Sequence, residues 1–219
     1  DLIHAGFERQ ARLRPDAIAL IADGRTCGYG ELNARANRIA HRLLAMGVRP
    51  GERVAICAER GVAMVAALLG ILKAGGAYVP LDPAYPPDRL AYMLEDAAPV
   101  ALVADGRLLD DPGVLGQAAL DASDPPMQVL RLDDEHTLAG YCDRDPDAAA
   151  LGTASDQLAY VISPSGWTGL PKGVMVQHRP AINLFEWVER SFGVGADDTL
   201  LFTTSLCFDL SVYDLFGIL

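Results

Sequence analysis

Apolar residues follow two patterns along this chain, and together they predict alternating strands and helices. Short apolar runs predict strands at residues 17–22, 53–57, 76–80, 99–103 and 157–162. Apolar residues at helical spacing, or in one longer run, predict helices at residues 2–13, 32–43, 62–72 and 88–95. This alternation indicates an α/β fold in which mixed or parallel sheets are covered by helices.

Three local signals refine this prediction. The stretch 62–72 is apolar on every side, which predicts a helix buried between layers. It is too short to span a bilayer, and it ends at Lys73. The dipeptide Asp23-Gly24 predicts a turn into a second short strand, and Gly47 is a candidate cap for the end of the helix before it.

Composition narrows the classes of function. The chain has 219 residues, of which 51% are hydrophobic, so it can bury a substantial core. Its net charge is −11 without a basic block, which argues against nucleic-acid binding. No signal peptide or membrane span is recognised, so we expect a cytoplasmic location and no membrane partner. The four cysteines form no CxxC pair and the four histidines show no ligand spacing, so no metal site is predicted.

Residues 133–156 differ in composition from the rest of the chain. They are acidic, rich in small residues and poor in large apolar ones. This composition predicts a solvated surface connection, with a functional insertion as the alternative.

The segment after the strand at 157–162 combines the residue types that hold phosphate groups. Its glycines let backbone N–H groups turn toward an anion, its hydroxyl side chains add donors, and Lys172 adds a positive charge. An apolar run at 174–176 then predicts a second strand. The segment is not a Walker A loop, in which Gly-Lys is followed by Ser or Thr. A flexible hairpin connection is the alternative interpretation.

Four segments resemble, in order and separation, the first four core motifs of the adenylation domains of nonribosomal peptide synthetases. These domains belong to the wider adenylate-forming family of acyl-CoA ligases and luciferases. The resemblance runs from about Ala5 to the last residue, and the second segment continues in the peptide-synthetase pattern as far as Leu90. The segments are Gly28-Tyr29-Gly30-Glu31-Leu32-Asn33, Leu72-Lys73-Ala74-Gly75-Gly76-Ala77-Tyr78-Val79-Pro80-Leu81-Asp82-Pro83, the loop at 163–173, and Phe208-Asp209-Leu210-Ser211-Val212-Tyr213-Asp214.

The resemblance implies an ATP-dependent activation of an amino acid. The amino acid carboxylate attacks the α-phosphate of Mg-ATP, giving an aminoacyl-adenylate and pyrophosphate, and the phosphopantetheine thiol of a carrier protein takes the acyl group. ATP and Mg²⁺ are the implied cofactors. A peptidyl carrier domain and a condensation or cyclization domain in the same polypeptide are the implied partners. The matching loop positions are Ser165, Gly166, Thr168, Gly169 and Lys172, with Thr168 and Lys172 as catalytic candidates.

The last motif carries the implied substrate site. Asp209 matches the aspartate that pairs with the α-ammonium group, and Leu210 and Tyr213 match pocket-lining positions. These residues resemble pockets for small or thiol amino acids, with cysteine first and glycine or alanine next. Alternatively, Asp209 belongs to a capping turn before the predicted helix, and Leu210 and Tyr213 are ordinary core residues.

The loop departs from the family pattern at three positions. Ser163-Pro164 stands where the family has Tyr-Thr, and Trp167 stands where a small hydroxyl residue is usual. Proline has no N–H to offer and the indole donates only once, so at least one phosphate contact is expected to be lost or displaced. A catalytically silent module that serves as a scaffold is therefore the first alternative function. An acyl-CoA ligase is the second, but such enzymes have no ammonium for Asp209 to pair with.

Residues 1–219 are thus interpreted as the incomplete large N-terminal subdomain of an adenylation domain. The resemblance places the Mg-binding acidic residue, the ribose-binding Asp, the catalytic Lys and a small swivelling subdomain beyond Leu219. We expect residues 1–219 alone not to turn over.

Overall fold

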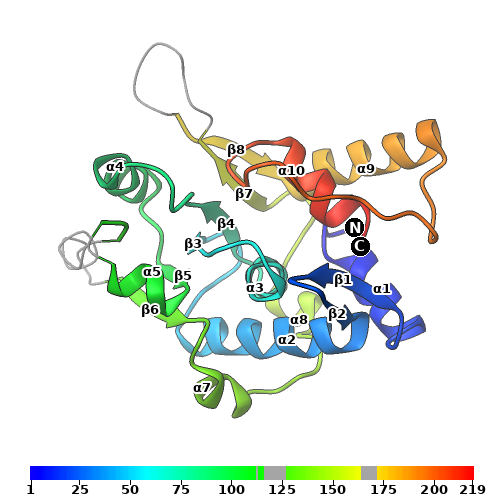
Figure 1. The fold of residues 1–219 in the computed structure, drawn as a ribbon, viewed down its shortest axis with the longest axis horizontal. Coiled ribbons are helices and arrows are strands. Elements are labelled where there is room, and N and C mark those ends of the chain that lie inside the picture. Colours follow the sequence, from blue (N-terminus) through cyan, green and yellow to red (C-terminus); the bar gives the residue numbers. More distant parts are fainter. Residues whose placement is uncertain (112, 116–126, 164–171) are drawn as a thin grey trace.

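The centre of the molecule is a six-stranded sheet in the order β6-β5-β3-β4-β7-β8 (Figure 1). The computed structural model describes residues 1–111, 113–115, 127–163 and 172–219. Neighbouring strands run parallel except for the edge strand β8, which is antiparallel to β7. The α/β fold with a mixed sheet is therefore confirmed. The strands are β3 (Arg53–Cys57), β4 (Ala77–Pro80), β5 (Ala101–Ala104), β6 (Gln128–Arg131), β7 (Leu158–Ile162) and β8 (Val174–Gln177).

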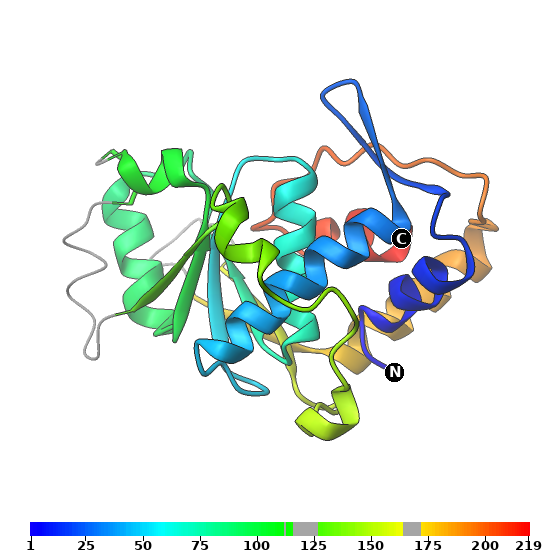
Figure 2. The same ribbon diagram turned by 90° about the horizontal axis from the view of Figure 1, so that it is seen from below.

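Helices cover both faces of the sheet, as Figure 2 shows. On one face, α2 (Tyr29–Ala45) and α3 (Val62–Lys73) pack over side chains of β3, β4 and β5. On the other face, α4 (Pro87–Ala97) packs over the alternate side chains of β3 and β5. Both faces of these strands are buried, which explains why they are apolar without alternation.

Smaller elements complete the described chain. The helix α1 (Ala5–Leu13) precedes a hairpin of β1 (Ile18–Ala22) and β2 (Arg25–Gly28), and Gly47 ends α2 with a φ of 91°. The helix α9 (His178–Phe192), which follows β8, was not predicted from the sequence. None of the described helices has the length and apolar character needed to cross a bilayer. The remaining elements are α5 (Gly106–Asp110), α7 (Glu135–Ala139), α8 (Ala148–Leu151), α10 (Leu210–Val212) and the π-helical turn η1 (Tyr213–Gly217).

The helix α3 is buried almost throughout, as its apolar sequence predicts, and it packs very closely against α2. The closest approach is at Gly70. A Cβ atom built there would lie 2.6 Å from Ile39 Cγ2 and 2.9 Å from the carbonyl oxygen of Ala36. Glycine is required here because the backbone of α2 occupies the space that a side chain would need.

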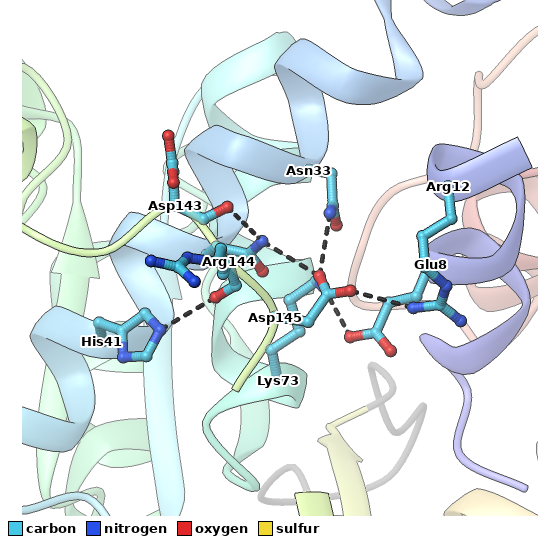
Figure 3. Close-up of polar contacts among 9 residues, drawn as sticks. Glu8, Arg12, Asn33, His41, Lys73, Asp143, Arg144 and Asp145 are labelled. Atoms are coloured by element: carbon cyan, nitrogen blue, oxygen red, sulfur yellow. Dashed lines mark hydrogen bonds and ion pairs between the residues drawn. The ribbon is translucent and has the colours of Figure 1, made fainter. Parts of the chain in front are cut away.

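One buried charge joins three distant segments (Figure 3). Lys73, at the end of α3, has a side chain that is 0% exposed, and its Nζ lies 2.6 Å from Glu8 Oε1 and 2.9 Å from Asp145 Oδ1. Burying a lysine without a partner is costly, so these two carboxylates are needed where the lysine lies.

Asp145 is the centre of this cluster. Its carboxylate also accepts hydrogen bonds from Arg12 Nη1 and from the side-chain amides of Asn33 and Asn37. Burial raises the pKa of Asp145, but the hydrogen bond from Lys73 and its charge outweigh this, and the pKa falls to about 2. The connection at 133–156 thus contributes a half-buried carboxylate to the core, besides forming α7 and α8.

We predict that Gly70→Ala destabilises the protein. The added methyl group meets backbone atoms that cannot move away independently, and overpacking of this kind costs on the order of 1–3 kcal/mol. The measurement is the midpoint of thermal or denaturant unfolding of the full-length protein. Gly6→Ala is the matched control, because a Cβ atom at that helical glycine meets nothing within 4 Å. Equal midpoints for the two variants would contradict the close packing of α2 and α3.

A second prediction concerns the stability of the protein at acidic pH. Because the pKa of Asp145 is depressed in the fold, its contribution is present above the unfolded value of 3.8 and is lost as the pH falls toward about 2. Asp145→Asn should therefore lower stability at pH 7 by about 2 kcal/mol, from roughly 1.36 kcal/mol per pKa unit. The deficit should shrink between pH 4 and pH 2.5, as followed by unfolding midpoints. Asp143→Asn is the control, since among the described residues that exposed carboxylate pairs only with Arg38, at 3.4 Å. A deficit that does not change with pH would refute the ionic role.

Candidate functional site

The candidate site lies along one edge of the sheet. Strands β3, β4, β5 and β7 are connected by parallel pairings, so their carboxyl ends meet at the same edge. In open α/β sheets, ligands bind outside this edge. The two motifs with predicted chemistry are the loop after β7 and the segment around Asp209.

The two ends of the phosphate-type loop are held together by the pairing of β7 with β8. Ile162 is the register partner of Val174, so Ser163 and Gly173 lie close together at the carboxyl end of β7, and the predicted second strand is confirmed. Ser163 is buried, and a Cβ atom at Gly173 would lie 2.9 Å from Val161 Cγ1. Lys172 is exposed at the end of the loop. The other predicted loop residues lie outside the described residues: Ser165, Gly166, Thr168 and Gly169, together with Pro164 and Trp167.

Asp209 lies at the N-terminus of α10 and is exposed. Its Oδ1 accepts a hydrogen bond from the backbone N–H of Leu210 at 2.9 Å. The side chain therefore takes part in the turn, as the capping alternative predicted. Ser211 belongs to the same turn, and its buried hydroxyl donates to the carbonyl of Phe208 at 2.6 Å.

Asp209 and the loop-bearing strand are electrostatically linked. Tyr160 lies on β7, two residues before the strand ends. Burial raises the pKa of Tyr160 to about 12, and the negative charge of Asp209 adds to this rise. The Asp209 carboxylate therefore lies near enough to Tyr160, on the strand that leads into the loop, to contribute to this rise in pKa.

The two other substrate-site candidates behave differently. Leu210 is 65% exposed, so it is not a core residue of the described chain. Tyr213 is partly buried and packs its ring edge-on against Phe185 of α9, with 6.0 Å between the ring centroids. Burial raises the pKa of Tyr213, and Glu189 and Asp198 add to this. An exposed leucine and a packed tyrosine beside Asp209 are compatible with a pocket wall.

The residues that fix the chain before Asp209 were not predicted from the sequence. Arg60, just beyond β3, hydrogen-bonds three carbonyl groups of residues 202–204. Asp82, just beyond β4, accepts a hydrogen bond from Ser205 Oγ at 2.8 Å. Their position in the sequence could have indicated them, because both are charged residues shortly after the carboxyl end of a buried parallel strand.

Other resembling motif residues lie away from this edge. Tyr29 begins α2 and stacks on Phe7, and Asn33 and Lys73 bind Asp145. An apolar hollow lies at the opposite, amino end of β7, lined by Leu158, Met175, Val176, Gln177 and Pro180. Among the described residues, no group of three or more His, Cys, Asp or Glu side chains is arranged to hold a metal ion.

Comparison with known proteins identifies the family of the chain. The family model described as "AMP-binding enzyme" matches residues 7–219. The chain is 42% identical over 217 residues to "Malpinin synthetase" of Mortierella alpina, covering 99% of this chain and 3% of that protein. It is 40% identical over 220 residues to "AMB antimetabolite synthetase AmbB" of Pseudomonas aeruginosa, covering 100% of this chain and 16% of that protein.

A solved structure shares the fold. The crystal structure of the nonribosomal peptide synthetase FmoA3 (S1046A) matches with a TM-score of 0.85 and 38% identity, over 99% of this chain and 21% of that one. The same protein has also been solved with α-methyl-L-serine-AMP bound. The chain therefore spans a small part of its relatives' length. It belongs to the AMP-binding enzyme family, as part of an adenylate-forming domain of the nonribosomal peptide synthetase type.

Proposed function

We propose that the protein activates an amino acid as its aminoacyl-adenylate and passes it to the phosphopantetheine thiol of a carrier domain. An oxygen of the amino acid carboxylate forms a bond to the α-phosphorus of ATP, and the bond from that phosphorus to pyrophosphate breaks. The thiol then replaces AMP on the acyl carbon. Reactions of this class depend on positioning and on neutralising charge.

The observation that carries the proposal is the exposed carboxylate of Asp209 beside the strand that leads into the loop. A carboxylate in this position can pair with the α-ammonium group of an amino acid through a charge-assisted hydrogen bond. Aryl and fatty acids have no such group, so Asp209 favours an amino acid over the substrates of acyl-CoA ligases. The structure of FmoA3 with an amino acid adenylate supports the same assignment by similarity.

The remaining assignments follow from the described residues and from similarity. Lys172 supplies a positive charge for the phosphates at the mouth of the loop. Leu210 and Tyr213 line the side-chain pocket, for which we propose a small or thiol amino acid, cysteine before glycine or alanine. Mg²⁺ would offset phosphate charge, and we assign none of the described residues to it. The partners are the carrier and condensation or cyclization domains of the same polypeptide, in the cytoplasm.

Asp209→Ala in the full-length protein should weaken activation of amino acids more than that of their deaminated analogues. Because Asp209 is exposed, the lost charge-assisted hydrogen bond is worth about 1.5–3 kcal/mol, or roughly 10- to 100-fold in kcat/KM. The measurement is substrate-dependent exchange of pyrophosphate into ATP. Asp209→Asn is the matched variant, since its amide oxygen still accepts from Leu210 N–H while the charge is gone. Equal losses for both substrate types, or full activity of Asp209→Asn, would assign Asp209 to the turn alone.

A catalytically silent scaffold module is the second candidate, and the residues at 164 and 167 favour it. Proline and tryptophan at these positions remove N–H and hydroxyl donors that the family loop usually offers. Asp209 does not separate this candidate from the first, because a silent module can retain its substrate pocket.

Pro164→Thr combined with Trp167→Ser should raise pyrophosphate exchange in the full-length protein. One recovered donor to a charged oxygen contributes about 1.5–3 kcal/mol, so the gain should be about tenfold or more. We leave Ser163 unchanged in this variant because it is buried and a larger side chain there needs new space. An active parent that exchanges pyrophosphate as fast as the double variant would exclude the silent module. No exchange in either protein would show that residues 164 and 167 alone do not account for the inactivity.

A further inference from the structure

The chain immediately before Asp209 has no regular secondary structure. Residues 199–203 belong to no helix or strand, and turns follow until α10 begins at Leu210. Backbone carbonyl groups in such a segment need partners outside the segment itself. The side chains that bind these carbonyl groups therefore also fix the backbone that leads to Asp209.

Arg60 supplies these partners. Its Nη1 donates to the carbonyl of Phe202 at 3.0 Å, and its Nη2 donates to those of Thr203 at 2.8 Å and Thr204 at 3.0 Å. The guanidinium carbon lies 4.8 Å from the centroid of the Phe202 ring. One planar, multiply donating group thus binds three consecutive carbonyls and lies over the ring of Phe202, the first of these three residues.

A second set of hydrogen bonds, made by Ser205 and Cys207, lies next to those of Arg60. Ser205 donates to Asp82 at 2.8 Å and accepts from the backbone N–H of Cys207 at 3.3 Å. Cys207 is buried, and its thiol lies 3.5 Å from the carbonyl of Pro80 at the end of β4. The segment 202–207 is therefore fixed to the carboxyl ends of β3 and β4, two residues before Asp209.

We propose that Arg60 is a positioning residue for the amino acid site. It acts through the backbone of residues 202–204, which it holds in the conformation that presents Asp209 to the substrate ammonium group. This inference rests on the proposed function. Arg60 does not belong to the phosphate loop, so its effect should fall on the amino acid and not on ATP.

The test uses Arg60→Ala and Arg60→Lys in the full-length protein, with Arg107→Ala as control. Arg107 is also an exposed arginine at this edge, and it pairs with Glu59, the neighbour of Arg60 in sequence. The readouts are the KM values for amino acid and for ATP in pyrophosphate exchange, and hydrogen–deuterium exchange of residues 202–209.

We expect Arg60→Ala to raise the KM for the amino acid about tenfold, from the loss of charged hydrogen bonds, with less than about twofold change for ATP. Amide exchange at 202–209 should become faster. Arg60→Lys should remain impaired because one ammonium group cannot span three carbonyls and stack on the ring. Arg107→Ala should match the parent in every readout.

Three results would overturn the inference. They are an unchanged amino acid KM in an active Arg60→Ala variant, equal changes in both KM values together with a lowered unfolding midpoint, and unchanged amide exchange at 202–209. If the parent shows no amino-acid-dependent exchange, the proposed function fails separately. Amide exchange then decides alone whether Arg60 fixes the segment.

Discussion

The fold depends on how the charge of Lys73 is accommodated in the core. An ammonium group without access to water requires carboxylates at hydrogen-bond distance, and Glu8 and Asp145 supply them from α1 and from the connection before β7. The end of α3 is thereby fixed in space. Two glycines follow after Ala74: Gly75 takes a φ of 80°, and the N–H of Gly76 donates back to the carbonyl of Ile71. The chain can then enter β4 at once, and β4 ends at the residues that hold the segment before Asp209.

The contacts of Lys73 and the path of the chain through β4 explain what several of the family-like motif residues do in the fold. The run from Leu72 to Pro83 contributes an ion pair, a tight turn and a buried strand before its last part reaches the candidate site at Asp82. Asn33, from the first motif, binds the same Asp145 carboxylate as Lys73 does. Most of the motif residues in these two segments therefore stabilise the fold. The proposed chemistry is assigned to the loop after β7 and to the segment around Asp209.

The sequence was informative where the pattern is local. The apolar runs predicted β3, β4, β5 and β7, and the uniform apolar character of α3 predicted its burial, because both faces of the sheet are covered. The contact of Lys73 with Asp145 and that of Arg60 with residues 202–204 could not be predicted. Their partners are 72 and more than 140 residues apart, and only the folded sheet brings them together. The helix α9 was missed although Ala181 and Phe185 have helical spacing on its buried side.

The structure also changes how the two interpretations of Asp209 relate to each other. The hydrogen bond from Leu210 N–H uses Oδ1 as an acceptor, and a carboxylate has a second oxygen with further lone pairs. Capping the turn and pairing with an ammonium group are therefore compatible. The cap restricts rotation of the side chain, which lowers the entropy lost when a substrate binds. Arg60 and Asp82 fix the backbone before Asp209, and the hydrogen bond from Leu210 N–H restricts the Asp209 side chain. The carboxylate is therefore in place before the proposed amino acid would bind.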